Sequence, residues 1–132
     1  MTAKNRVLLV EDEASLRRSL TKYLERAGYA CECCSTAREA IVLAERLVPE
    51  IVITEYRLPD ANGLVLLEKL KQIVPDAAGI LLSEYDFQAM VKDLVDVVVR
   101  SFLKKPFDIV ELEAALSSAS SKLRLASSGA ER

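Results

Sequence analysis

The sequence of 132 residues contains no histidine, and this absence excludes several kinds of catalytic and metal site. Its three cysteines, Cys31, Cys33 and Cys34, lie close together, but without a histidine they do not complete a zinc set of the usual spacing. A nucleophile–base pair that depends on histidine is excluded as well, which argues against a small hydrolase or phosphatase. The simplest interpretation of the cysteines is reduced thiols in a strand, with Cys31 and Cys33 on one face and Cys34 on the other.

Long hydrophobic runs and glycine-rich loops are also missing from the sequence. Only four apolar residues separate the N-terminal segment from Glu11, too few for the core of a signal peptide, and no stretch approaches the length of a membrane span. We therefore expect a cytoplasmic chain without a membrane segment. The chain has four glycines in all and no glycine-rich phosphate loop, which argues against a nucleotide-dependent enzyme.

No excess of positive charge is present, since 18 lysines and arginines stand against 20 aspartates and glutamates. This near balance gives no broad basic surface, so direct binding to nucleic acid is not expected. The length suits one folded domain. From about Ser117 the composition shifts to serine and alanine. We assign residues 1–122 to the domain and residues 123–132 to a C-terminal tail or linker, frayed in structure.

Apolar runs alternate with segments of helical period, which indicates repeated strand–helix units and a parallel sheet. Two helix starts carry a capping-box pattern, Thr36 with Glu39 and Asp108 with Glu111. The sequence therefore predicts an α/β fold with five strands and five helices. The predicted strands are 6–10, 30–34, 50–54, 79–83 and 97–103, the fourth helix lies within 87–95, and the fifth begins near residue 109.

Charged side chains end three of the predicted strands: Glu11 with Asp12, then Glu55, then Lys105. Because the carboxyl ends of parallel strands share one rim, these residues can converge into one site. Adjacent acids penalise each other's ionisation, and a bound divalent cation such as Mg²⁺, which prefers oxygen ligands, would relieve that penalty. An acidic helix start explains Glu11 and Asp12 equally well from position alone. For Lys105, the corresponding alternative is a solvated surface lysine.

Four fragments in order, VLLVED at 7–12, ITEYRLP at 53–59, ILLS at 80–83 and FLKKPF at 102–107, resemble the receiver domain of bacterial two-component response regulators. The resemblance covers roughly residues 5–122. It implies a doubly wound, flavodoxin-like sheet in strand order 2-1-3-4-5, and a phosphorelay signalling module rather than an enzyme. The implied partner is a sensor histidine kinase or an output protein, bound through the face of the fourth helix, fifth strand and fifth helix, which can also form a homodimer.

The resemblance also assigns a magnesium site. Asp12 would bind Mg²⁺ directly, Glu11 mostly through water, and Arg57 through its main-chain carbonyl, with the side chain of Glu55 as a further ligand. Lys105 would reach the acceptor carboxylate, and its peptide bond to the following proline is expected to be cis.

Two further residues match the family's switch positions. Ser83 ends the fourth predicted strand with a hydroxyl that can bind a phosphoryl oxygen. Phe102 matches the aromatic switch partner, although a buried aromatic in a strand is ordinarily part of the core.

Glu55 stands where the family has its phosphate-accepting aspartate. The additional methylene displaces the carboxylate by roughly 1.5 Å, and a misplacement of about 1 Å can cost on the order of a hundredfold in rate. Efficient phosphorylation is therefore not expected. The longer acid could imitate the phosphorylated state in part, with one charge in place of about one and a half to two. Alternatively, Glu55 binds metal or pairs with Lys105 in a phosphate-independent pseudo-receiver, an interaction module that Val98 and Val99, in place of the usual Gly-Ala, also favour.

Overall fold

Five short segments form parallel strands in the computed structural model of the chain, which describes residues 5–85 and 99–130 and side chains as far as Ser120. The strand order is β2-β1-β3-β4-β5, and every neighbouring pair is parallel. This confirms the predicted doubly wound α/β fold and its strand order. The strands are β1 (Arg6–Val10), β2 (Ala30–Cys34), β3 (Ile51–Glu55), β4 (Ala78–Ser83) and β5 (Ser101–Lys104).

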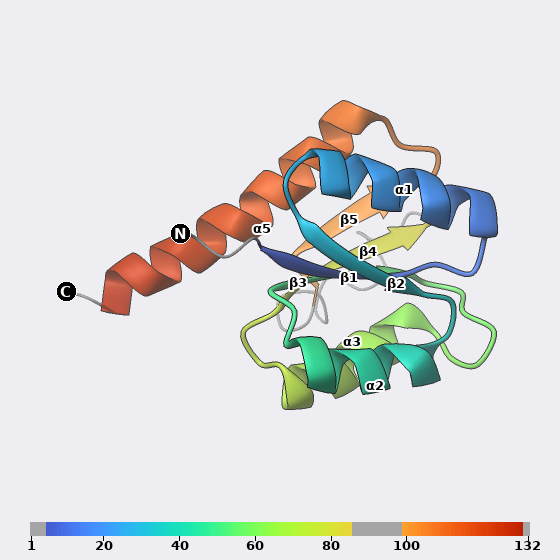
Figure 1. Cartoon of the computed structure of the whole chain (residues 1–132), viewed down its shortest axis with the longest axis horizontal. Helices are drawn as coiled ribbons and strands as arrows, with labels where there is room; N and C mark the ends of the chain where they lie inside the picture. Colours follow the sequence, from blue (N-terminus) through green and yellow to red (C-terminus); the bar gives the residue numbers. More distant parts are fainter. Residues whose placement is uncertain (1–4, 86–98, 131–132) are drawn as a thin grey trace.

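Helices cover both faces of the sheet, α1 and α5 on one side and α2 and α3 on the other (Figure 1). Alternate residues of each strand point to opposite faces, so β1 places Leu9 in the first cluster and Leu8 in the second, both fully buried. The central strand β3 is buried at all five positions, as a strand covered on both faces requires. The described helices are α1 (Ala14–Arg26), α2 (Ala37–Leu47), α3 (Gly63–Ile73) and α5 (Ile109–Ala130).

The boundaries of β1 and β2 match the prediction, and those of β3 and β4 lie within one residue of it. The predicted start of β5 at residue 97 is wrong, because the strand begins at Ser101, where it pairs with Ile80 of β4. Val99 is buried, but it lies before the strand. The β-branched run 97–99 therefore overstated the strand, whose length follows its pairing with β4. Residues 97 and 98 and the predicted fourth helix within 87–95 lie outside the described residues.

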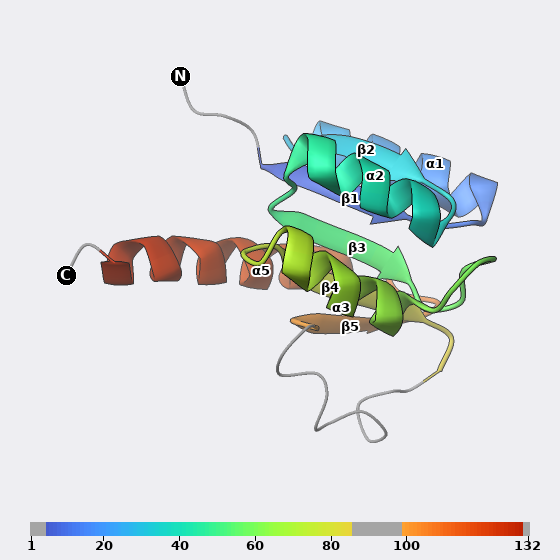
Figure 2. The ribbon, with the colours of Figure 1, turned by 90° about the horizontal axis from the view of Figure 1, so that it is seen from below.

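Helix α5 continues to Ala130, well past the sheet (Figures 1 and 2). The terminus expected to be frayed is thus helical over residues 123–130. The domain boundary at residue 122 stays a prediction. None of the helices in residues 5–85 and 99–130 has the combination of length and hydrophobicity that crossing a bilayer requires.

The capping box of Asp108 with Glu111 is present in full, whereas in that of Thr36 with Glu39 the glutamate binds the preceding amide, of Ser35, instead of the Thr36 amide. The Thr36 hydroxyl accepts a hydrogen bond from the Glu39 amide at 3.1 Å, and the Glu39 carboxylate accepts one from the Ser35 amide at 3.2 Å. Asp108 and Glu111 exchange reciprocal hydrogen bonds at the start of α5, at 2.9 and 3.1 Å. These local contacts satisfy amides that have no partner within a helix.

Two of the three cysteines of β2 pack against the core, and Cys33 is exposed. Cys34 is buried in the cluster under α2, whereas Cys31 packs against the cluster on the opposite face, as predicted from alternation. All three thiols are free. Burial raises the pKa of Cys31 and of Cys34 to about 12, so both stay protonated and weakly reactive near neutral pH.

Candidate functional site

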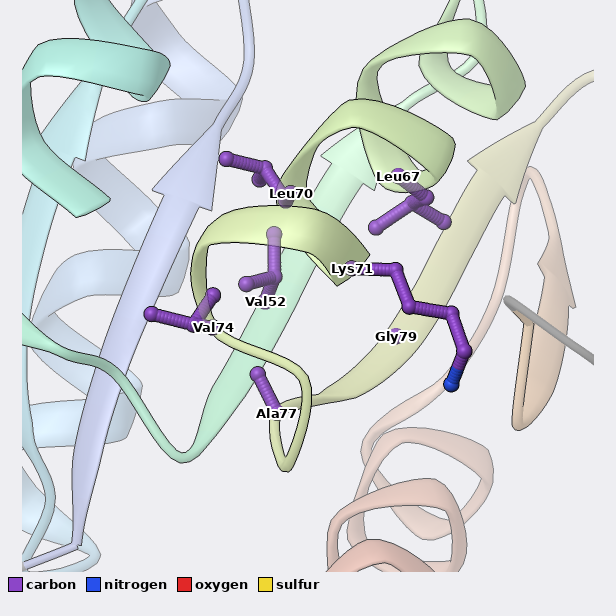
Figure 3. A pocket seen from close by; sticks show the side chains of 7 residues that line it. All are labelled: Val52, Leu67, Leu70, Lys71, Val74, Ala77 and Gly79. Carbon is purple, nitrogen blue, oxygen red and sulfur yellow. The ribbon is translucent and has the colours of Figure 1, made fainter. Parts of the chain in front are cut away.

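Two pockets of very different size adjoin the sheet. The smaller one, about 20 Å³, lies between β3 and α3, where Val52, Leu70 and Val74 supply apolar walls and the Lys71 side chain extends outward (Figure 3). Such a volume holds about one water molecule. The larger one, about 260 Å³, lies at the carboxyl ends of the strands, and its lining is mostly polar. Its lining residues are Glu11, Asp12, Glu13, Glu55, Arg57, Ser83, Glu84, Tyr85 and Lys105.

The larger pocket brings together the strand-end residues that the sequence singled out. Glu11 follows β1, Glu55 ends β3, Ser83 ends β4, and Lys105 follows β5. Their convergence results from the parallel sheet, whose strands all end at the same rim. Backbone hydrogen bonds hold that rim together, including one from the Lys105 amide to the Ser83 carbonyl at 2.7 Å.

A three-residue ion-pair cluster occupies the floor of this pocket. The Lys105 ammonium lies 3.0 Å from Glu11 Oε1 and also contacts Glu55 Oε1. Only 1% of the Glu11 side chain and 9% of the Glu55 side chain are exposed, against 17% for Lys105. Lys105 is therefore a counter-charge for two buried acids, which rules out the alternative of a solvated surface lysine.

Burial has the largest effect on the pKa of the Glu11 carboxyl. It raises the pKa of this carboxyl above its ordinary value, and hydrogen bonds from the Glu13 amide and from Lys105 offset only part of the effect. Burial also opposes the charged form of Lys105, but the hydrogen bonds to Glu55 and Glu11 outweigh it and raise the pKa of the ammonium. Lys105 is therefore charged at neutral pH.

The remaining oxygens of the two buried carboxylates are bound by main-chain amides. Glu11 Oε2 accepts a hydrogen bond from the Glu13 amide at 3.1 Å, and Glu55 Oε2 accepts one from the Arg57 amide at 3.1 Å. All four oxygens of Glu11 and Glu55 thus have a donor within the described protein. Charge-assisted bonds on both oxygens define the orientation of each carboxylate.

Asp12 differs from its neighbour Glu11. It lines the pocket but is exposed, and its carboxylate has no hydrogen bond or ion pair among the residues that the structure covers. Within 5–85 and 99–130, no three side chains from aspartate, glutamate, histidine or cysteine are placed to hold a metal ion. Asp12 and Glu55 therefore line one pocket without forming a ready metal cage.

The predicted switch residues have different surroundings. Ser83 is buried, and its hydroxyl accepts a hydrogen bond from the Tyr85 amide at 2.9 Å. Phe102 is half-buried, packs against the cluster under α2 and α3, and does not line the pocket. The core interpretation therefore describes Phe102 in this conformation, while a switching role stays a prediction.

Tyr85 is a pocket residue that the sequence analysis did not select. Its hydroxyl is hydrogen-bonded to the Arg57 guanidinium, which also lies 5.1 Å from the centre of the tyrosine ring. The Arg57 side chain is thereby directed toward an aromatic ring at the pocket mouth. The only sequence signal was an aromatic residue two positions after a strand end, which is common in proteins without a functional reason.

The loop after Glu55 is fixed to a neighbouring helix by Asp60. The Asp60 carboxylate accepts hydrogen bonds from the Ala37 and Arg38 amides, at 2.9 and 3.0 Å, at the start of α2. These bonds lower the pKa of Asp60, because amides at a helix N-terminus stabilise the charged form. The loop that carries Arg57 thus begins at β3 and is also bound, through Asp60, to the start of α2.

Replacing Asp60 with asparagine is expected to lower the thermal unfolding midpoint by a few degrees at pH 7. The pKa of Asp60 is lower in the folded chain than in the unfolded chain. Its carboxylate therefore stabilises the fold at pH values above the unfolded pKa, and this stabilisation is lost as the pH falls through the folded pKa. The difference in unfolding midpoint between wild type and Asp60→Asn should therefore become smaller below about pH 4. Thermal scans monitored by circular dichroism measure this, with Asp76→Asn at an exposed turn as control. A gap that is constant with pH would contradict it.

The chain is similar in sequence to a known protein family and to several known proteins. The profile of the response regulator receiver domain matches residues 7–117. The chain is 33% identical to the chemotaxis protein CheY of Thermotoga maritima over 116 residues, which cover 87% of this chain and 97% of CheY. It is 36% identical to the transcriptional regulatory protein PmrA of Pectobacterium parmentieri over 112 residues, or 83% of this chain and 49% of PmrA.

A solved structure extends the likeness to three dimensions. The signal receiver domain of an HD domain-containing protein from Pseudomonas fluorescens superimposes with a TM-score of 0.85 at 26% identity, covering 100% of this chain and 96% of that one. Among the curated relatives, CheY is matched along nearly its full length. Several others are matched over only 24% to 62% of theirs.

Proposed function

The chain belongs to the response regulator receiver family, and from this premise we propose that it is a phosphorelay signalling module with Glu55 at the phosphoacceptor position. Receiver domains interact with histidine kinases and output domains, and they are signalling modules rather than typical enzymes. The observation that carries the proposal is the contact of Glu55 with Lys105 at the floor of the pocket. The module would act in the cytoplasm through residues 1–122.

Glu55 impairs phosphorylation in this proposal, because its carboxylate is about 1.5 Å further along the side chain than that of an aspartate. The same carboxylate imitates a phosphorylated acceptor in part. It binds the Lys105 ammonium, as a phosphoryl oxygen would. The Ser83 hydroxyl, in contrast, accepts a hydrogen bond from the Tyr85 amide. Glu55 therefore reproduces the contact with Lys105, while the hydroxyl of the switch residue Ser83 is bound to a main-chain amide.

Receiver domains generally bind Mg²⁺ in their acidic pocket, and for this chain we propose Asp12, Glu55 and the Arg57 carbonyl as ligands, with Glu11 acting through water. These donors are all oxygens, the type that Mg²⁺ prefers. Their arrangement does not fit a bound ion as it stands, because Lys105 and two main-chain amides occupy the oxygens of Glu11 and Glu55. In this arrangement the Lys105 ammonium is the counter-charge of both buried acids.

The test is labelling by acetyl phosphate with magnesium present. The wild type should incorporate little phosphate, whereas Glu55→Asp should be labelled on the order of a hundredfold faster, because the shorter carboxylate regains the position required for attack. Glu84→Asp makes the same chemical change elsewhere on the pocket lining and should stay at the wild-type level. A Glu55→Asp variant that remains unlabelled would mean that the pocket is not a receiver site.

A phosphate-independent pseudo-receiver is the alternative, and Val98 and Val99, in place of the family's usual Gly-Ala, favour it. Such a module would bind its partner, or a second copy of itself, through the face of the fourth helix, β5 and α5, without contacting nucleic acid. Ile109 and Val110 on α5 are exposed apolar residues, 51% and 71%. Partner binding that is unchanged by magnesium, phosphodonor and Glu55→Asp would support this alternative. Altered affinity in Glu55→Asp would instead favour phosphate signalling.

A further inference from the structure

Strand β2 forms one edge of the sheet, and no strand within residues 5–85 and 99–130 lies beyond it. Helices α1 and α2 contact β2 from its two faces (Figure 2), yet three of its five residues, Ala30, Glu32 and Cys33, are exposed. The edge is therefore open to solvent over most of its length. An open edge presents main-chain donors and acceptors that can bind another extended chain.

The hydrogen bonds to β1 determine which main-chain groups face this edge. The Ala30 amide binds the Asn5 carbonyl at 2.9 Å, so Ala30 points toward β1. In a parallel pair the direction alternates along the strand. The last residue, Cys34, follows this alternation, since its carbonyl accepts a hydrogen bond from the residue after β1. The N–H and C=O groups of Cys31 and Cys33 therefore point outward, away from β1.

Acidic side chains lie near the open edge. Glu32 at the centre of β2 and Glu25 on α1 are exposed, and neither has an ion pair in the part of the chain that the structure describes. Burial is the main cause of the raised pKa of Cys31, and the charges of both glutamates add to it, so both lie close to this thiol. Arg17 of α1 is directed to the end of β1, where it donates a hydrogen bond to the Glu11 carbonyl at 2.8 Å. The negative charge at the edge thus has no described ion-pair partner.

We propose that the β2 edge is a docking site for an extended segment of a partner protein that carries a lysine or arginine opposite Glu32. The segment runs antiparallel to β2 and exchanges main-chain hydrogen bonds with Cys31 and Cys33. Its basic side chain lies beside Glu32, and opposite charges directly across two strands stabilise the pairing. The residues on either side of it face the two thiols. This docking site lies outside the pocket and does not depend on the proposed phosphorelay function.

A second copy of the chain fits this edge less well. Antiparallel pairing of two β2 edges that uses all their outward main-chain groups places Cys31 of one copy opposite Cys33 of the other. The same register places Glu32 opposite Glu32, and like charges directly opposite each other destabilise a strand pair. A partner strand with a basic central residue replaces this repulsion with attraction. The charge at Glu32 therefore favours a different, basic partner.

The first experiment is an NMR titration of the ¹⁵N-labelled full chain with two peptides, Ac-Thr-Val-Lys-Val-Thr-NH₂ and Ac-Thr-Val-Glu-Val-Thr-NH₂. The lysine peptide should shift the amide signals of Cys31 and Cys33 more than that of Glu32, because the Glu32 amide points toward β1. It should also bind about fivefold more tightly than the glutamate peptide. Equal affinities, or shifts that do not alternate along β2, would overturn the proposal.

Charge reversal at Glu32 tests whether this residue selects the peptide. Glu32→Lys should invert the preference, so that the glutamate peptide binds about fivefold more tightly than the lysine peptide. Glu68→Lys makes the same change at an exposed position on α3 and should keep the preference of the wild type. A preference that is unchanged in Glu32→Lys, or inverted in both variants, would overturn the proposal.

Disulfide capture at Cys33 gives a second measurement with the unmodified chain. Cys33 is the exposed thiol, whereas burial raises the pKa of Cys31 and Cys34 to about 12. The peptide Ac-Thr-Val-Cys-Lys-Val-Thr-NH₂ places its cysteine opposite Cys33, at a Cα separation of about 5.5 Å that a disulfide can span, and its lysine opposite Glu32. In a buffer of reduced and oxidised β-mercaptoethanol, mass spectrometry should detect about threefold more adduct than with glutamate in place of the peptide lysine. Equal capture of the two peptides would contradict the proposed edge pairing.

Amide hydrogen exchange of the chain without peptide tests the competing occupant. The amides of Cys31 and Cys33 should exchange with solvent at the same rate at low and at high protein concentration. Protection that increases with concentration, together with a dimer in sedimentation equilibrium, would show that a second copy occupies the edge, which overturns the proposal. None of these measurements involves phosphate or Glu55, so their outcome and that of the acetyl phosphate labelling are independent.

Discussion

Replacing Lys105 with glutamine is expected to lower the free energy of unfolding by about 3 kcal/mol at neutral pH. The substitution leaves Glu11 and Glu55 buried beside each other without a counter-charge. Removing one partner of a buried ion pair costs far more than removing an exposed one, because the remaining charge stays desolvated. Urea denaturation measures the change, and Lys104→Gln, at the exposed neighbouring position, should shift it by less than about 0.5 kcal/mol.

The pH dependence identifies the cause of this destabilisation. The pKa of Glu11 in the folded chain is already raised by burial, and losing Lys105 removes an interaction that lowers it. A raised carboxyl pKa means that protonation favours the folded state, so the loss in Lys105→Gln should shrink as the pH falls from 7 toward 4. The stabilising charge of Lys105 itself, whose pKa is raised, is present below about pH 10 and lost above its folded pKa. An equal loss at pH 5 and pH 7 would mean that side-chain packing, not charge, is responsible.

The sequence was sufficient to predict the convergence of the site because one geometric rule determines it. Apolar runs that alternate with helices form a parallel sheet, and such a sheet brings its strand ends to one edge. Glu11, Glu55, Ser83 and Lys105 are therefore predictable as neighbours although up to 94 residues separate them. The cis peptide between Lys105 and Pro106, expected from the family resemblance, is also present.

The partners of each side chain were not predictable in the same way. Lys105 binds both Glu11 and Glu55. This pairing depends on side-chain length and burial, which the periodic pattern of apolar residues does not specify. The bond from Asp60 to the start of α2 joins a loop to a distant helix, so local capping rules do not detect it. The contact of Arg57 with Tyr85 is another long-range pairing of this kind. The sequence was thus sufficient to locate the pocket, whereas the pairing of its charged side chains depends on how the chain packs.

The boundary of β5 illustrates a limit of local propensity. Three consecutive valines at 97–99 favour extended structure, yet the strand begins only at Ser101, opposite Ile80. The Arg100 amide binds the Gly79 carbonyl at 2.7 Å, immediately before the regular pairing starts. The regular pairing with β4 thus begins at Ser101, although β4 itself begins two residues before Ile80.

Replacing Gly63 with alanine is expected to lower the free energy of unfolding by about 3 kcal/mol, because no space exists for a side chain there. A Cβ atom at Gly63 would lie 2.5 Å from the Glu55 carbonyl oxygen, 2.8 Å from Leu81 Cδ1 and 3.1 Å from Tyr56 Cα. Two of these three atoms belong to the backbone, which cannot rotate away. The Gly63 amide also binds the Tyr56 carbonyl at 2.6 Å, so α3 cannot move outward without losing that bond.

Gly28→Ala is the matched comparison, since Gly28 has a positive φ of 99° but a Cβ atom added there would have no neighbouring atom within 4 Å. Its cost is backbone strain alone, about 1 kcal/mol. Urea denaturation of both variants separates steric exclusion from strain, and a Gly63→Ala loss no larger than that of Gly28→Ala would contradict the argument. Because the blocking carbonyl belongs to Glu55, Gly63→Ala should also displace this residue from Lys105. Faster acylation of Lys105 in Gly63→Ala than in Gly28→Ala would then link the packing of α3 to the ion pair in the pocket.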